Sequence, residues 1–188
     1  MNLKRLALGT TLLVSTLFAG TYNVDKSHSN IGFKIKHMMI SNVVGKFNTF
    51  NGTFEYDEKK NTLKSLTAQI DVSSVDTDNK KRDGHLQKSD MLDVEKYPKI
   101  TFVVTKIDGE DLYGDFTLKG ITKNIKLELE NGGTIKDPWG NNRAAFVLSG
   151  KIKRSEYGVT YNSILEAGGV AVGDVVKLNI EVEGIEKK

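Results

Sequence analysis

The chain has 188 residues and no cysteine, and it carries 27 lysine and arginine residues against 24 acidic residues, a formal net charge of +3 at pH 7. The lack of cysteine excludes disulfides, thiol nucleophiles and thiolate metal ligands. Because charges of both signs are interspersed without a basic tract, we expect no binding to nucleic acid.

Residues 1–19 have the pattern of a secretory signal peptide. Lys4 and Arg5 precede an apolar run over residues 6–18 that is too short to span a bilayer as an ordinary helix, and Ala19 is the small residue expected before a cleavage site. We therefore expect a single mature domain over residues 20–188, located in the periplasm or secreted. No later apolar stretch approaches the length of a membrane span, so we expect no integral span in the mature chain.

Most of the remaining sequence alternates apolar and polar residues with a period of two, which predicts half-buried β-strands. Turn signals separate these segments. Short connections between many strands favour an all-β fold, an antiparallel up-and-down barrel closed on itself, with a two-sheet sandwich as the alternative. In chain order, the apolar faces of the eight predicted strands lie within residues 31–35, 50–56, 66–72, 100–104, 112–118, 125–129, 146–152 and 176–182.

One charged segment interrupts the strands, and we expect a helical insertion near residues 78–94. If Asp78 is the N-cap, the helical period places four side chains on roughly one face, namely Arg82, His85, Leu86 and Ser89. A cation, an imidazole and an apolar side chain on one face suit a ligand with a polar head and an apolar tail. The alternative is a solvated connecting helix in which Arg82 and Asp83 meet neighbouring charges.

The sequence carries no recognisable catalytic or metal-binding motif. His28, His37 and His85 are too widely spaced for a contiguous metal site, and convergence of all three around zinc is a minor alternative. The serine-nucleophile, phosphate-loop and dinucleotide motifs are absent, and the carboxylates lie mostly in turns. We therefore expect no enzyme activity, no metal and no cofactor, and a hydrolase that uses a histidine is the first alternative.

Phenylalanines are spread over nearly every predicted strand. An eight-stranded barrel either fills its interior with such side chains or encloses a small apolar ligand, and the periodicity does not choose between these two arrangements. The phenylalanines concerned are Phe33, Phe47, Phe50, Phe54, Phe102, Phe116 and Phe146.

An ordered set of segments covers nearly the whole mature chain: Tyr22-Asn23-Val24-Asp25 with His28-Ser29, Gly45-Lys46-Phe47, Arg82-Asp83-Gly84-His85-Leu86, Tyr97-Pro98-Lys99-Ile100-Thr101-Phe102, and residues 114–122, 152–158 and 172–176. In this order and spacing they resemble the YceI-like family of periplasmic polyisoprenoid-binding proteins. The resemblance implies a lipocalin-like extended antiparallel β-barrel that encloses an isoprenoid or a long-chain amphipathic lipid. A homodimer is a further expectation from the family.

The resemblance favours a ligand pocket over a filled core. It predicts a periplasmic carrier protein that catalyses no reaction. Arg82, organised by Asp83 and His85, would bind the polar head, while Arg154 is a second candidate cation whose expected role is a structural ion pair. A structural or adhesion module without a pocket is the second alternative. The tail would contact side chains predicted to face inward, namely Phe33, Ile35, His37, Leu86, Phe102, Phe116 and Leu118.

One position departs from the family pattern. Where the family has a bulky aromatic residue after the acidic residue of a Ser-Asp segment, this chain has Met91. Because methionine adapts its shape more readily than a ring, we expect a pocket of different length or selectivity.

Overall fold

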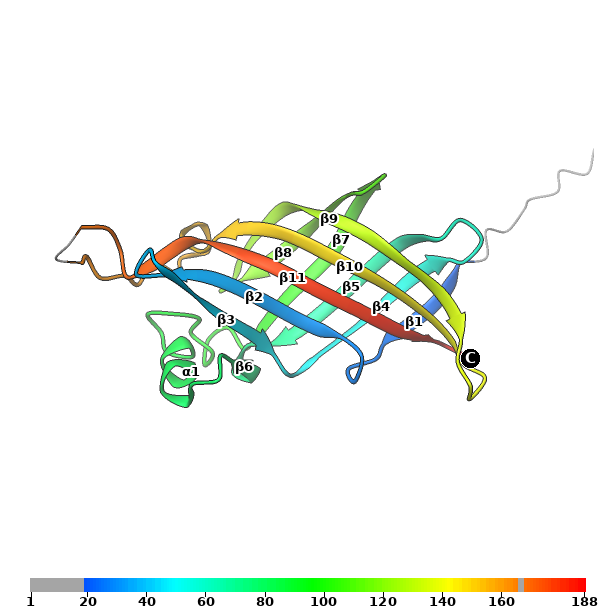
Figure 1. Ribbon diagram of the computed structural model, residues 1–188, viewed down its shortest axis with the longest axis horizontal. Helices are drawn as coiled ribbons and strands as arrows, with labels where there is room; N and C mark the ends of the chain where they lie inside the picture. The colour runs from blue at the N-terminus through cyan, green and yellow to red at the C-terminus, as the bar shows by residue number, and fades with distance from the viewer. Residues whose placement is uncertain (1–18, 166–167) are drawn as a thin grey trace, which may run out of the picture.

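The computed structural model describes residues 19–165 and 168–188, so the predicted signal peptide lies, apart from Ala19, outside the described residues. Within them, one antiparallel sheet contains every strand (Figure 1). No helix among the described residues is long and apolar enough to cross a membrane. The strands are β1 (Gly20–Val24), β2 (Asn30–His37), β3 (Ser41–Phe47), β4 (Phe50–Asp57), β5 (Thr62–Asp71), β6 (Val75–Asp76), β7 (Lys99–Asp108), β8 (Asp111–Leu118), β9 (Ile121–Lys136), β10 (Asn142–Lys153) and β11 (Val172–Glu186).

The sheet closes into a barrel, as predicted. The strand order β1-β4-β5-β7-β8-β9-β10-β11 returns to its start because β1 pairs with both β4 and the end of β11. At this closure Tyr22 lies opposite Glu186, and Val24 lies opposite Gly184. Closure leaves no free edge between the first and last strands, which excludes the two-sheet sandwich.

The β2–β3 hairpin does not follow the simple meander that the sequence favoured. It packs against the first part of β11 rather than between β1 and β4. Strand β11 has 15 residues, so a single edge holds β2 along its first part and β1 at its end. The hairpin therefore forms one wall at the end of the barrel where the short helix α1 (Lys80–Leu86) lies (Figure 1).

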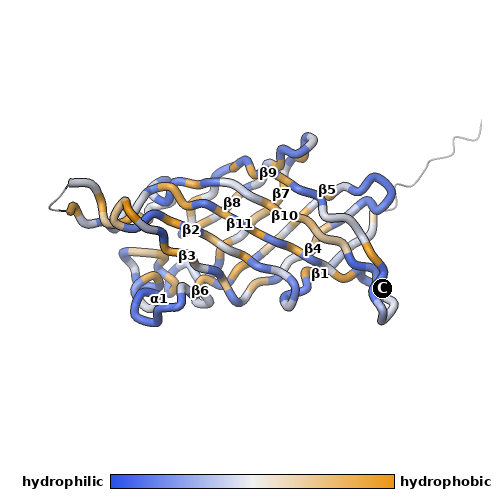
Figure 2. Tube along the Cα trace, viewed as in Figure 1, coloured by the Kyte–Doolittle hydropathy of each residue, from blue (hydrophilic) through white to orange (hydrophobic). Residues whose placement is uncertain are grey.

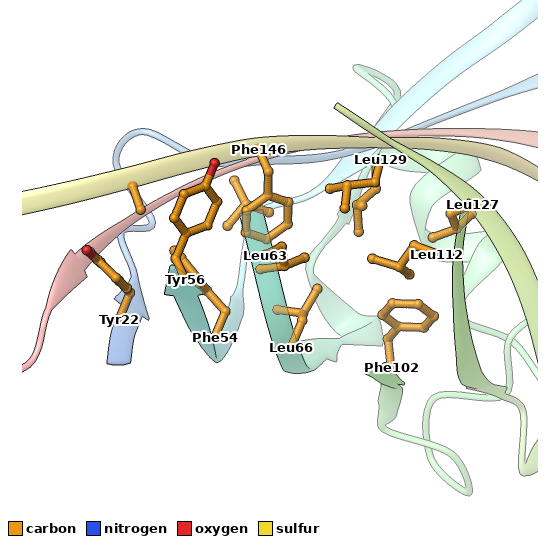
Figure 3. Packing of buried hydrophobic residues seen from close by; sticks show 13 residues of the cluster. Tyr22, Phe54, Tyr56, Leu63, Leu66, Phe102, Leu112, Leu127, Leu129 and Phe146 are labelled. Carbon is orange, nitrogen blue, oxygen red and sulfur yellow. The ribbon is translucent and has the colours of Figure 1, made fainter. Parts of the chain in front are cut away.

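The barrel interior is filled at the end away from α1. The rings of Tyr22 and Phe54 are stacked with centroids 5.1 Å apart, and Phe54 meets Phe146 edge to face at the same centroid distance (Figure 3). Leu63 and Leu112 pack into the same cluster and are almost completely buried. Apolar packing of this kind is the main stabilising contribution in a chain without disulfides.

The expected helical insertion is much shorter than residues 78–94. Helix α1 covers seven residues, and Asn79, not Asp78, is its N-cap. Asn79 has an extended backbone and its side chain accepts a hydrogen bond from the Arg82 N–H, whereas Asp78 lies at φ 58°, in the left-handed region. Ser89 lies beyond the helix, so it does not share the predicted face. Two short 3-10 helices, η1 (Val72–Ser74) and η2 (Arg154–Tyr157), complete the described elements.

Candidate functional site

A cavity of about 330 Å³ lies inside the barrel at the α1 end. Its wall is mostly apolar and comes from β2, β3, β6, β7, β8, β10, β11, α1 with the turn after it, and η2 with the loop that follows it. A smaller cavity of about 80 Å³ adjoins it, and Phe33, Phe47 and Phe116 line both. The interior is thus packed at one end and hollow at the other, so neither a fully filled core nor a fully open barrel describes it.

The predicted ligand-binding residues largely share this cavity. Phe102 lines the smaller cavity instead, and Asp83 lines neither. The residues on the wall of the larger cavity are Phe33, Ile35, His37, Arg82, His85, Leu86, Phe116, Leu118 and Arg154.

Strand periodicity positions the aromatic part of the wall. Phe33 and Ile35 are alternate residues of β2, so both face inward. Opposite Phe33 on β3 is Gly45, where a Cβ would lie 2.4 Å from the Phe33 Cζ. Gly114 makes room for the Phe102 ring in the same way. These two glycines therefore permit close packing of an aromatic side chain across neighbouring strands.

Thr77 fixes the orientation of Arg82. The Arg82 Nε donates to Thr77 Oγ1 at 2.8 Å, and Nη2 donates to the Thr77 carbonyl oxygen at 2.7 Å. The Asp83 carboxylate accepts from the Thr77 N–H at 2.9 Å and from its hydroxyl at 2.5 Å. Asp83 thus organises Arg82, as predicted, but through a buried threonine. Among the described residues, none accepts a hydrogen bond from the Arg82 Nη1.

His85 does not organise Arg82. Its Nε2 lies 3.1 Å from an oxygen of Asp90, and this hydrogen bond holds the pKa of the Asp90 carboxyl below its usual value. The ring of His85 meets Tyr161 edge to face, with centroids 4.7 Å apart. His85 therefore joins α1 to the turn after it and to the loop after η2.

Arg154 is buried, with 6% of its surface exposed, but the expected ion pair is wrong. Its guanidinium donates to the carbonyl oxygens of Gly173 at 2.9 Å, Val159 at 2.7 Å and Val172 at 3.3 Å. No carboxylate within the described ranges lies within 4.0 Å of it, since Asp174 instead accepts hydrogen bonds from Ser155. Burial lowers the pKa of this guanidinium.

The charged part of the cavity wall has one sign. Lys36, Arg82 and Arg154 line it together with His37 and His85, whereas no aspartate or glutamate of residues 19–165 and 168–188 does so. Asp83 and Asp90, which lie near Arg82 and His85 in the sequence, accept hydrogen bonds from protein partners. We call the part of the wall formed by Arg82, His85 and Tyr161, where the last two side chains reach the surface, the mouth of the cavity. The mouth suits a group that accepts hydrogen bonds or carries negative charge.

Several wall residues are not among those predicted to contact a ligand. Met91, which departs from the family pattern, is buried on the wall, and its carbonyl oxygen accepts from Lys119 Nζ at 2.8 Å. Val176 and Leu178 follow the strand alternation and could have been found from it. Tyr161 carries no such signal, because only the folded chain brings it to His85, and Thr77, which lies off the wall, is found only through its hydrogen bonds to Arg82.

The three histidines do not converge on one site, because His37 and His85 line the larger cavity and His28 does not. His28 lies with Asp25 and Glu183, whose candidate ligand atoms all lie within 4.8 Å of one another. Arg143 forms ion pairs with this group, since its Nη1 lies 2.9 Å from Asp25 and 2.5 Å from Glu183, and its Nε also donates to Asp137 at 2.8 Å. Burial acts to raise the pKa of Asp25, but hydrogen bonds from His28, Arg143 and a backbone N–H lower it to about 2. The geometry thus indicates a structural ion-pair cluster.

Comparison with known proteins agrees with this geometry. A family model described as a YceI-like domain matches residues 22–184. Protein YceI of Salmonella newport is 37% identical over 198 aligned positions, which cover 99% of this chain and 100% of that protein. A UPF0312 protein of Staphylococcus epidermidis is 40% identical and covers 86% of this chain and 95% of its own length.

Solved structures show the same fold. The Campylobacter jejuni YceI protein is 39% identical, with a TM-score of 0.69 over 87% of this chain and 96% of that one. A domain of Saccharophagus degradans described as polyisoprenoid binding is 16% identical, with a TM-score of 0.66 over 90% of this chain and 100% of that one. At that identity the likeness is one of fold alone. From its matching domain and its relatives, the chain belongs to the YceI-like family.

Proposed function

We propose that this protein binds and carries an amphipathic isoprenoid-type or fatty-acid-like lipid in the periplasm, without a reaction of its own. The apolar cavity of about 330 Å³ with cationic groups at its mouth is the observation that supports this function most directly. The description of the Saccharophagus domain as polyisoprenoid binding supports the same class of ligand.

The apolar wall would hold the lipid tail. If each methylene takes about 30 Å³, roughly the share of one water molecule in the liquid, the larger cavity holds about ten of them. At about 0.8 kcal/mol for each buried methylene, the tail contributes about 8 kcal/mol before the ordering cost of association is subtracted. A tail of more than about ten methylenes would extend into the adjoining cavity, past Phe33 and Phe116, which line both cavities.

The head group would lie at Arg82 and His85. Thr77 holds the guanidinium in place through Nε and Nη2, which leaves the Nη1 edge for an acceptor such as a phosphate or carbonyl oxygen. Lys36 lines the same cavity and adds positive charge. A preoriented guanidinium loses little entropy on binding, so it favours one orientation of the lipid.

The cavity wall favours binding over hydrolysis. Across the described ranges, the wall contains no serine, threonine, aspartate or glutamate that could act with His37 or His85 as a nucleophile or an orienting acid. The carboxylate beside His85 belongs to Asp90, which lies off the wall. Binding without turnover therefore fits these residues better than histidine-dependent hydrolysis.

Native mass spectrometry of protein purified from the periplasm, followed by organic extraction, tests the proposal. We expect a noncovalent lipid that organic solvent releases intact. A hydrolase would yield split products, and an adhesion module would yield no lipid. Failure to co-purify or to bind any added isoprenoid or acyl amphiphile would refute the proposal.

The head-group position is tested with Arg82→Lys and Arg82→Ala. We expect the alanine variant to weaken binding of a labelled isoprenoid phosphate by about 1.5–3 kcal/mol, with lysine intermediate, because a charge-assisted hydrogen bond is lost. The headless hydrocarbon is the matched control, and its affinity should barely change. Equal losses for both ligands would show that Arg82 only supports the fold through Thr77.

A further inference from the structure

Exposed apolar side chains gather beside the cavity mouth, in the turn between β2 and β3 and in the loop before β11. Ile40 is 86% exposed and Ile164 is 88% exposed, and Met38 and Met39 are also exposed. We call these four residues the apolar tip. Figure 2 shows apolar chain segments at this end of the barrel, beyond the ends of β2 and β11. Large side chains exposed together at the entrance of a cavity indicate an interaction surface.

The two segments of the apolar tip are held together. The Met38 N–H donates to the Ala171 carbonyl oxygen at 2.8 Å, and a Cβ at Gly169 would lie 3.4 Å from the Met39 Cγ. Ile164 pairs with Val170 in an isolated bridge. The exposed side chains are therefore presented by a connected pair of loops.

The turn adopts its shape against the preference of its residues. Met38 and Met39 have φ values of 49° and 63°, a left-handed pair that hairpin turns normally give to asparagine and glycine. Two methionines in these positions cost steric energy. They also supply flexible, polarisable side chains that adapt to an irregular apolar partner. The sequence thus keeps large apolar groups where the backbone favours small or polar ones.

The tip is continuous with the cavity. His37, which directly precedes the β2–β3 turn, lines the cavity, as do Tyr161, Ala171 and Val172 from the loop side. A lipid tail that leaves the mouth would therefore pass directly beside the apolar tip. A partner covering the tip would also shield that tail from water.

Cations flank the same mouth. Lys80, Lys81 and Lys88 are exposed around a hollow of α1 that also includes Arg82 and His85. Two acidic residues of this segment are hydrogen-bonded to protein groups, Asp83 to Thr77 and Asp90 to His85. Asp78 is exposed before the helix and sets one negative charge against the three exposed lysines. A partner at this surface would meet apolar side chains and positive charge together.

We propose that the apolar tip and the α1 lysines form a docking surface for an anionic lipid bilayer, through which ligand passes between membrane and cavity. Shallow insertion of apolar side chains together with attraction of lysines to anionic headgroups is the usual physical basis of peripheral membrane binding. A protein partner would need a shaped complementary surface, whereas a bilayer accepts the flexible side chains of Met38 and Met39. The proposal concerns the outer surface, so lipid binding inside the cavity can hold even if it fails.

The single tryptophan of the chain makes a direct test possible. Trp139 is 79% exposed and lies in the β9–β10 turn, at the opposite end of the barrel from α1 (Figure 1). We compare the wild type with a Trp139→Phe, Ile40→Trp double variant. Both are mixed with vesicles of phosphatidylethanolamine and phosphatidylglycerol. We expect a blue shift of emission in the double variant and none from Trp139, because only the apolar tip enters the bilayer.

Co-sedimentation with the same vesicles measures affinity. We expect Ile164→Ser to weaken vesicle binding about tenfold, since one exposed isoleucine no longer transfers into the bilayer. The matched control is Ile135→Ser, which removes an exposed isoleucine from β9, on the far side from the mouth. A Lys80→Gln, Lys81→Gln double variant should lose preference for phosphatidylglycerol, and salt should weaken wild-type binding.

Three results would overturn the proposal: no sedimentation of the wild type, a shift of Trp139 emission on vesicle binding, or equal losses for Ile164→Ser and Ile135→Ser. Equal binding to vesicles of phosphatidylcholine alone would overturn the role of the lysines. Organic extraction of each variant separates this outcome from failure of the proposed function, because a protein that carries lipid without binding vesicles contradicts the docking surface only.

Discussion

Replacement of Ile35 by tryptophan examines whether the ligand tail occupies the larger cavity. Ile35 lies on β2 opposite Val43 of β3 and Val176 of β11, and it lines the cavity wall. Tryptophan is well accepted in strands, so the hairpin should still form. The larger side chain extends into the space proposed for the tail and blocks part of it.

The size of the effect follows from the cavity volume. Tryptophan adds about six heavy atoms to an isoleucine position, which displaces roughly five methylenes of a tail, worth about 4 kcal/mol. Partial repacking of the wall reduces this loss to about 2–3 kcal/mol. We therefore expect an affinity lower by about 30- to 150-fold.

Titration of a labelled isoprenoid amphiphile measures this affinity, and urea unfolding confirms that the variant still folds. Val44→Trp is the matched control, because Val44 lies on the same hairpin but is 63% exposed and is absent from the cavity wall. Wild-type affinity in a folded Ile35→Trp protein would refute the tail position. An equal loss in Val44→Trp would show that the hairpin, not the cavity, is being perturbed.

Two further predictions concern stability. Arg143→Met should lower the urea midpoint at pH 7, and the gap to the wild-type curve should narrow as pH falls from about 5 to 2. The reason for the narrowing is that the pKa of Asp25 is lowered to about 2 in the folded protein. At pH values above the unfolded pKa of this carboxyl, its ionised form stabilises the fold by about 1 kcal/mol after solvent screening. Protonation of Asp25 at lower pH removes this stabilisation. The gap should not close fully, because Arg143 also pairs with Asp137, whose pKa, which burial acts to raise, is held well below its usual value by hydrogen bonds from Arg143 and Asn141. Parallel curves would contradict it. Gly84→Ala should stabilise α1 by about 1 kcal/mol, because a Cβ there meets nothing within 4 Å. Hydrogen exchange of α1 amides should slow, and faster exchange would contradict the prediction.

The clean alternation of apolar residues made most of the barrel predictable. Eight strands follow a period of two, and each appears in the sheet. Three strands gave no clear signal: β1 is short, β3 carries Val43 and Val44 side by side, and β6 has two residues. The place of the β2–β3 hairpin depends on the length of β11, a tertiary property that local periodicity does not contain.

The residues of the candidate site were predictable in part, whereas their hydrogen-bond and packing partners were not. Phe33 and Ile35 follow from strand register, and Arg82 and His85 from helical spacing, so the sequence places them near the wall. Their partners lie elsewhere in the chain: the Tyr161 ring packs on His85 after a loop that no periodicity describes. The ion pair expected for Arg154 failed for the same reason, since backbone carbonyls that only the folded loop brings close accept its hydrogen bonds instead.

The two ends of the barrel differ in whether they leave room for a ligand. At the far end Arg143 joins β10 to Asp25 and to Glu183 of β11, and the rings of Tyr22 and Phe54 are stacked in the packed core, so a ligand of the proposed kind would enter and leave at the α1 end. Helix α1 is only seven residues long and contains Gly84, so it is too short to be stable without tertiary contacts. Its tertiary contacts come from Asp83 and Arg82 with Thr77, from His85 with Asp90 and from Leu86 packed against the core, and three of these side chains, Arg82, His85 and Leu86, also line the cavity. Under the proposed function, a lipid bound at Arg82 and His85 would therefore add contacts to a helix of low intrinsic stability and would stabilise α1.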